Sequence, residues 1–108
     1  MGRIGDSPVP LKIVPSIGVL TLELQIELAH SLKDKRSVVK GLKDRLRRKF
    51  NVSVAEIAHQ ESWQRSTVAV VTVSGDRSFA EKVLQAAEQD AIDIAGPDLA
   101  SSDIEWIE

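Results

Sequence analysis

The sequence predicts an α+β domain with the element order β-α-β-β-α-β. Three observations predict it: alternating apolar residues at 17–28, apolar residues at helical spacing in 31–50 and 78–92, and further strand-like segments at 52–58, 67–73 and 104–107. This order is the split-βαβ, ferredoxin-like arrangement, so we expect an antiparallel four-stranded sheet covered by two helices on one face. The 108 residues suit a single domain. We expect this domain at 17–108, after a flexible or extended N-terminal tail at 1–16.

The first strand and the first helix have the clearest patterns. One face of the strand at 17–28 is apolar, with Leu20, Leu22, Leu24 and Ile26. Ser31-Leu32-Lys33-Asp34 then has the spacing of a capping box, with Asp in place of the usual Glu or Gln, so Ser31 is the predicted N-cap. The helix should end near Phe50, the last of a series of apolar residues at helical spacing: Val38, Val39, Leu42, Leu46 and Phe50.

The two middle strands differ in their patterns. The segment 52–58 alternates imperfectly, because Ile57 falls on the face opposite to Val52 and Val54, and this predicts a bulge or a twisted edge strand. The segment 67–73 is apolar on both faces, which predicts a central position in the sheet.

The second helix is predicted from another capping box, Ser78-Phe79-Ala80-Glu81. Its apolar side is expected to consist of Phe79, Val83, Ala86 and Ala87. The helix should end near Asp90 or Ile92, because Gly96-Pro97 stops any helical pattern. A short last strand carrying Trp106 is expected at 104–107.

The composition excludes several classes of chemistry. The chain has no cysteine, which removes disulfides, thiol catalysis, iron–sulfur clusters and thiolate zinc sites. Met1 to Ser16 lacks the apolar core of a signal peptide, and no apolar run approaches the roughly 20 residues that span a bilayer. We therefore expect a cytoplasmic protein without a membrane partner.

The charges are unevenly distributed along a chain whose formal net charge is only −2. Between 33 and 49 nine Lys and Arg residues face only Asp34 and Asp44, and the balance reverses after Asp76. Normal solubilising surfaces mix the two signs, so the first helix is the predicted place for an anionic partner.

Five cations of this helix follow one another at intervals of three and four residues: Lys33, Arg36, Lys40, Lys43 and Arg47. At about 100° per residue they form one stripe beside the apolar stripe. Such a row suits a polyanion, because each neutralised phosphate releases counterions. The alternative is a solvated helix face on which Lys35 and Lys49 extend their ammonium groups past the core into water.

The connection between the middle strands is long for a hairpin and contains Trp63, which either binds a partner or covers the core; the preference of Trp for burial favours the core. The fold places this connection at the same end as the start of the first helix. The predicted nucleic-acid or anion site therefore combines Lys33, Lys35, Arg36, Lys40, Lys43, Arg47, His59, Gln60, Trp63, Gln64 and Arg65.

Signals for catalysis are weak. His30 and His59 are the only histidines, and their spacing matches no metal motif. No glycine-rich phosphate loop, nucleophile elbow or zinc signature is present. We therefore predict no catalytic residues, no metal and no cofactor, and we favour a non-enzymatic role.

Three segments resemble one known family: Ser31 to Lys40, Phe50 to Glu56, and His59 to Arg65. The strings SLKDKR and HQESWQR within them are similar to those of the YlxP-like family of small bacterial proteins, a domain of unknown function. The resemblance covers about 17–107, and the family usually has Glu where this chain has Asp34. It implies a ferredoxin-like fold and a bacterial cytoplasmic setting. Genes of this family often lie beside translation-initiation and ribosome-maturation genes, which links it to RNA by association only.

Three hypotheses about function follow. The first is a non-catalytic module that binds structured or ribosomal RNA through the basic helix. The second is a homodimer or other protein-interaction module, formed through the edge strands or by contact between the acidic half and the basic helix of a neighbour. The third is a small-molecule anion-binding protein or enzyme that uses the end of the domain near Trp63.

Overall fold

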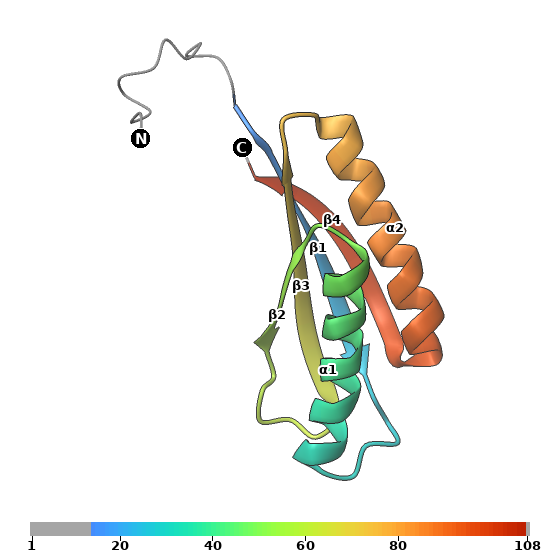
Figure 1. Ribbon diagram of the computed structural model, residues 1–108. Helices are drawn as coiled ribbons and strands as arrows, with labels where there is room; N and C mark the ends of the chain where they lie inside the picture. The colour runs from blue at the N-terminus through green and yellow to red at the C-terminus, as the bar shows by residue number, and fades with distance from the viewer. Residues whose placement is uncertain (1–13, 108) are drawn as a thin grey trace.

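The computed structural model describes residues 14–107, which form a four-stranded sheet with two helices (Figure 1). In chain order the elements are β1 (Ser16–Gln25), α1 (Leu32–Lys49), β2 (Ser53–Ala58), β3 (Arg65–Ser74), α2 (Arg77–Ala95), a 3₁₀ turn η2 (Gly96–Asp98) and β4 (Leu99–Ile107). The predicted order β-α-β-β-α-β is confirmed. Residues 1–13, most of the predicted tail, and residue 108 lie outside the described residues.

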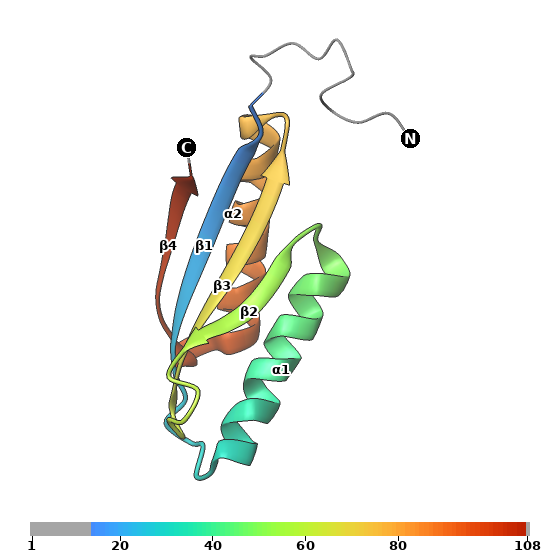
Figure 2. The same cartoon turned by 90° about the vertical axis from the view of Figure 1, so that its left-hand side faces the viewer.

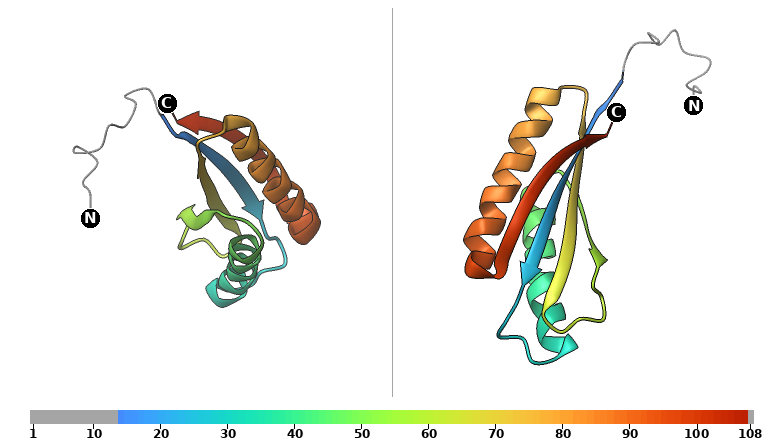
Figure 3. Two further views of the ribbon diagram at one scale, coloured as in Figure 1. Left: turned by 45° about the horizontal axis from the view of Figure 1, so that its top comes forward. Right: turned by 180° about the vertical axis from the view of Figure 1, so that it is seen from behind.

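The strands pair antiparallel in the order β2-β3-β1-β4, so β1 and β3 are central, as predicted for the third strand. Both helices cover one face of this sheet, and the other face is left open (Figures 1 and 2). The predicted irregularity in the second strand is confirmed by a register shift between Glu56 and Ala58. The sheet edges are β2, beside α1, and β4 on the far side, which the view from behind shows clearly (Figure 3).

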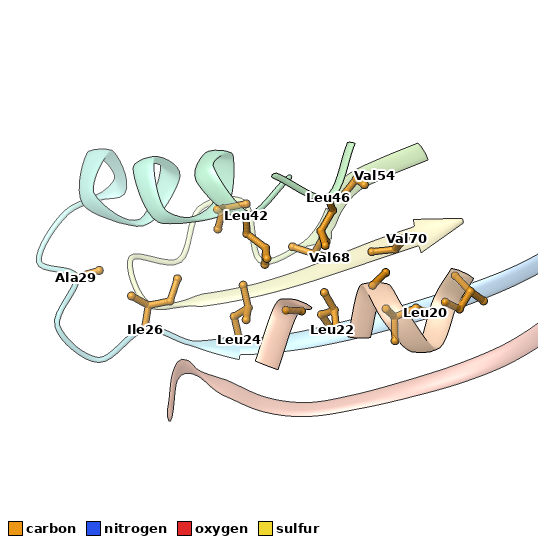
Figure 4. Packing of buried hydrophobic residues seen from close by; sticks show 14 residues of the cluster. Leu20, Leu22, Leu24, Ile26, Ala29, Leu42, Leu46, Val54, Val68 and Val70 are labelled. Carbon is orange, nitrogen blue, oxygen red and sulfur yellow. The ribbon is translucent and has the colours of Figure 1, made fainter. Parts of the chain in front are cut away.

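The core lies between the sheet and the helices and is built from the alternating face of β1 (Figure 4). Leu20 pairs with Val70 and Leu22 with Val68 across the two central strands, and all four side chains are fully buried. Leu42 and Leu46 from α1 pack against this layer, as the apolar spacing predicted.

The start and the phase of α2 were predicted wrongly. The N-cap is Asp76, whose Oδ1 accepts the Phe79 N–H at 3.2 Å, and the helix begins two residues before the position that a Ser78 cap implies. Its fully buried side chains are those of Ala80, Leu84, Ala87 and Ala91, whereas Phe79 is 58% exposed. The Asp76 cap accepts one of the free N–H groups of the first turn, and small alanines let the helix approach the sheet closely.

The ends of two other elements also differ from the prediction. Helix α2 continues to Ala95, because no glycine precedes Gly96, which adopts a positive φ of 56°. Strand β4 begins at Leu99 and not at 104, since its exposed polar residues pair with β1 through the backbone, which hydrophobic alternation does not reveal. Strand β1 ends at Gln25, so Leu28 belongs to the loop that follows it.

Candidate functional site

The N-terminus of α1 is capped as the sequence predicted. The Ser31 Oγ accepts the Asp34 N–H at 3.0 Å, and the Asp34 Oδ2 accepts the His30 N–H at 3.0 Å. The Asp34 carboxylate thus already occupies the positive end of the helix dipole. The predicted contribution of this helix end to an anion site is therefore weakened by an internal acceptor.

Lys35 is buried and does not extend into water, so both surface interpretations of this residue are corrected. Its side chain is 0% exposed, and its Nζ donates to the Glu56 Oε2 and to the His59 carbonyl, each at 2.8 Å. Longer contacts join the Nζ to the carbonyls of Gln60 at 3.4 Å and Arg65 at 3.3 Å. We call Lys35, Glu56 and these three carbonyls the Lys35 clamp.

Sequence reasoning missed this clamp, although its signal was present. Lys35 lies in phase with Val39, Leu42 and Leu46 on the buried side of α1, and Glu56 follows Val54 on the core face of β2. A cation and a carboxylate that both fall on core faces are expected to pair, because an unpaired buried charge is costly.

Glu56 is ionised within the clamp. Burial opposes its negative charge, but hydrogen bonds from Lys35 and Ser66 and the charges of Lys35 and Lys43 outweigh this effect and hold the pKa of Glu56 below its ordinary value of 4.5. The Ser66 hydroxyl donates to the same Oε2 at 2.6 Å. The clamp is therefore a stable ion pair at neutral pH, and it fixes the path of the chain from β2 to β3.

The β1–α1 loop and the β2–β3 loop are joined at the end of the molecule where α1 begins (Figures 1 and 2). The Gln64 side chain donates to the carbonyls of Glu27 at 3.0 Å and Ala29 at 3.3 Å, and the Ile26 N–H donates to the Gln64 carbonyl at 2.7 Å. The predicted meeting of these two segments is confirmed. Gln64 serves as the link between them.

Trp63 does not cover the core, so the expectation of burial is wrong. Its side chain is 57% exposed, next to the Gln64 link. Sequence reasoning also missed Leu28, which is 86% exposed on the neighbouring loop. No periodicity exists in a loop, so the sequence had no signal for either orientation.

The five predicted stripe residues form one flank of α1, on the side of β2. Arg47 Nη2 donates to the Val54 carbonyl at 2.6 Å and lies 3.7 Å from Asp44, and Lys40 pairs with Asp44 at 2.6 Å. Within 14–107, Lys33, Arg36 and Lys43 take part in no hydrogen bond or ion pair. We call Lys33, Arg36, Lys40, Lys43 and Arg47 the β2 flank.

The opposite flank of α1 faces α2 and is neutralised. Asp90 of α2 lies 2.7 Å from the Lys49 Nζ and 3.4 Å from the Arg45 Nε. Its carboxylate is nearly buried, and its Oδ2 accepts no hydrogen bond from the described residues. These two cations therefore hold the helices together and are not part of a free basic surface.

The remaining predicted residues, His59, Gln60 and Arg65, all lie in or beside the β2–β3 loop. His59 has a positive φ of 67°, a conformation that its carbonyl contact with Lys35 holds in place, and its side chain is half-buried. Gln60 Nε2 lies 3.4 Å from the Glu56 carbonyl, and Arg65 is exposed. Among the described residues no three His, Asp or Glu side chains are grouped in a way that could hold a metal.

A cavity of about 400 Å³ lies at the other end of the molecule. It is lined by Val14, Pro15, Ser16, Ile17, Arg77, Trp106 and Ile107, and the Arg77 guanidinium lies 4.2 Å from the centre of the Trp106 ring. It contains none of the predicted site residues. In the described part of the chain, no helix is long and apolar enough to cross a membrane.

Comparison with known proteins defines the family. Residues 17–102 match the family model "Protein of unknown function (DUF503)". The chain belongs to this family. A DUF503 relative from Bacillus subtilis (strain 168), "Uncharacterized protein YlxP", is 45% identical over 69 residues, which are 64% of this chain and 75% of that protein. The predicted resemblance to YlxP-like proteins is thereby confirmed.

The fold of this DUF503 chain is found among solved structures. The de novo designed protein Foldit4 superposes with a TM-score of 0.57 at 12% identity, covering 88% of this chain and 98% of the designed one. A dimeric ferredoxin-like protein of unknown function from Thermobifida fusca gives a TM-score of 0.46 at 15% identity, covering 84% of this chain and 90% of that protein. At 12% identity the likeness to Foldit4 concerns the fold alone. The predicted ferredoxin-like fold follows from the element and strand order of this chain.

Proposed function

We propose that this chain is a non-catalytic module that binds structured RNA, such as ribosomal RNA, through the β2 flank of α1. The proposal rests on one observation: some cations of α1 are paired with carboxylates of the fold, and others are not. Lys35, Arg45 and Lys49 are neutralised by carboxylates of the fold. Within 14–107, Lys33 and Arg36 have no carboxylate partner, and Lys43 makes no close ion pair and acts on Glu56 only at longer range. Cations left without internal partners are available to an external polyanion.

The geometry of the flank suits a phosphate backbone. Its residues recur every three or four positions over α1, which gives a row along a helix of 18 residues, about 27 Å long at 1.5 Å per residue. Contacts between such a row and successive phosphates would release condensed counterions and lower the binding free energy. Asp44 of α1 lies beside this row and is engaged by Lys40 and Arg47.

The test is a charge reversal with a matched control. We expect Lys33→Glu/Arg36→Glu to weaken binding of ribosomal RNA fragments by about tenfold or more at low salt, because two phosphate contacts become repulsive. Arg48→Glu/Lys82→Glu makes the same change in net charge away from the β2 flank, on residues that are exposed. Equal losses for the two variants would show that only net charge matters, and would overturn the proposal.

Self-association is a second candidate, favoured by the open face of the sheet. Val73 and Ile107 lie there with more than half of their side chains exposed. The β2 edge is a poorer docking strand, because the side chains of Arg47 and Gln60 contact its Val54 and Glu56 carbonyls. Light scattering at low and high salt distinguishes the cases: a monomer under both conditions removes the homodimer.

A further inference from the structure

We propose that Trp63 is a stacking platform for an unpaired base, so that the site takes single-stranded or looped RNA in preference to a uniform duplex. This inference rests on the proposed function, since the β2 flank would hold the phosphates of the same strand. The chemistry is general: an indole ring stacks on any base whose face is free, and bases inside an A-form duplex have no free face.

The Trp63 ring is available for stacking. Residue Trp63 is more than half exposed, and within residues 14–107 no cation lies over its ring, although such contacts exist at Phe50 and Trp106. Leu28 is exposed on the neighbouring loop, which the Gln64 side chain ties to the Trp63 loop through two backbone carbonyls. These two exposed apolar side chains therefore lie on loops that are joined to each other.

The loop that carries Trp63 is held in place on both sides of the residue. The Lys35 Nζ contacts the carbonyls of His59, Gln60 and Arg65, which precede and follow it. Inside the loop, the Ser62 Oγ accepts the N–H groups of Gln64 at 3.3 Å and Arg65 at 2.9 Å. Because this backbone is already ordered, little conformational entropy would be lost when a base binds.

Exposed charged groups surround this end, which suits a charged partner such as a nucleic acid better than an apolar protein surface. Arg65 is exposed two residues after Trp63, and Lys33 and Arg36 lie in the first turns of α1, which begins at the same end (Figure 2). Glu27, Asp34 and Glu61 are also exposed there, and the Asp34 carboxylate accepts the His30 N–H. These carboxylates repel phosphate, so the strand is expected to leave the indole along the β2 flank, where the exposed cations lie.

The experiment compares one RNA strand in two forms. A labelled RNA of about twelve nucleotides without self-complementarity, within the usual span of single-strand sites, is titrated with the intact protein by fluorescence anisotropy, alone and annealed to its complement. We expect Trp63→Leu to weaken binding of the single strand by about tenfold, as for the loss of one stacked base. Trp63→Phe should retain most of the affinity, because it keeps an aromatic ring, and duplex binding should not change in either variant.

A second readout reports on the indole itself. The chain has two Trp and no Tyr, so in Trp106→Phe the fluorescence comes from Trp63 alone. Single-stranded RNA should quench this emission in proportion to binding, and the duplex should not. Single-strand binding that survives Trp63→Leu, with no quenching, would overturn the stacking role while leaving phosphate binding by the β2 flank intact. If the wild-type protein binds neither RNA form, both proposals are overturned. If an acidic protein quenches the Trp63 emission and RNA does not, Trp63 is a protein-docking residue.

Discussion

The two sides of helix α1 carry the same kinds of residue and use them differently. On the side of the core and α2, Lys35, Arg45 and Lys49 are each matched by a carboxylate of the fold. On the β2 flank, Lys33 and Arg36 have no such match within the described residues, and Lys43 acts on Glu56 only at longer range. The difference shows that an excess of cations in a sequence has two components, one that stabilises the fold and one that remains for a partner. Substitutions of cations and carboxylates from each group separate these two components.

The largest effect is expected for Lys35→Met, which keeps the apolar stem but removes the buried ammonium. Glu56 would then be left without its counterion and three carbonyls without a donor. Breaking a buried ion pair from one side costs about 3–5 kcal/mol in the free energy of unfolding. Urea denaturation measures this loss. The double variant Lys35→Met/Glu56→Gln has no unpaired charge, so part of the lost stability should return. If Lys35→Met alone is as stable as the wild type, the Lys35 clamp does not stabilise the fold.

Stability should also depend on pH through Glu56. The pKa of Glu56 in the folded state is lower than its ordinary value of 4.5. The ionised carboxylate therefore stabilises the fold at pH values above 4.5, and this stabilisation is lost as the pH falls through the folded-state pKa. We expect the difference in stability between the wild type and Glu56→Gln to shrink as the pH falls from 6 toward 3. A difference that stays constant over this range would mean that the carboxylate is not held by Lys35 and Ser66.

A smaller effect is expected for Asp90→Asn, which removes the charge between α1 and α2. Arg45 and Lys49 are each about half exposed, so water screens their attraction to the carboxylate. We expect a loss of about 1 kcal/mol or less in the free energy of unfolding. The loss should decrease in high salt, and thermal denaturation at two salt concentrations checks this. A salt-independent loss would indicate packing and not charge.

The smallest effect on stability is expected for Lys33→Gln/Arg36→Gln. Both side chains are exposed and, within 14–107, neither makes a hydrogen bond or an ion pair, so the free energy of unfolding should change by no more than about 0.5 kcal/mol. The same urea denaturation curves provide the comparison with Lys35→Met. A loss of several kcal/mol would place these cations in the fold-stabilising component after all.

Periodic segments of the sequence predicted the structure well, and aperiodic ones did not. The alternation of Leu20, Leu22 and Leu24 and the capping box at Ser31 suffice to define β1 and the start of α1, because both depend on local geometry. The start of α2 was misplaced because Asp76 and Ser78 both have capping side chains, and only tertiary packing chooses between them. The last strand was predicted too short, since its pairing with β1 involves the backbone of polar residues.

The candidate site was predicted in location but not in detail. The topology was enough to bring the start of α1 and the Trp63 loop to one end of the domain. Lys35 faces the core because it is in helical phase with Leu42 and Leu46. This phase can be read from the sequence, but a charged residue is normally expected at the surface. The exposure of Trp63 depends on long-range contacts of a loop with Lys35 and Ala29, and no local pattern encodes those.

If the β2 flank binds phosphates, the affinity for RNA must depend on the salt concentration through Lys33 and Arg36. The logarithm of the association constant should fall linearly with the logarithm of the salt concentration. Each neutralised phosphate contributes about 0.7 to 0.9 to the magnitude of this slope. In Lys33→Gln/Arg36→Gln the slope should be smaller by between about one and two, while Arg48→Gln/Lys82→Gln should keep the slope of the wild type. An affinity that does not depend on salt, or slopes that are the same for both variants, would contradict the account.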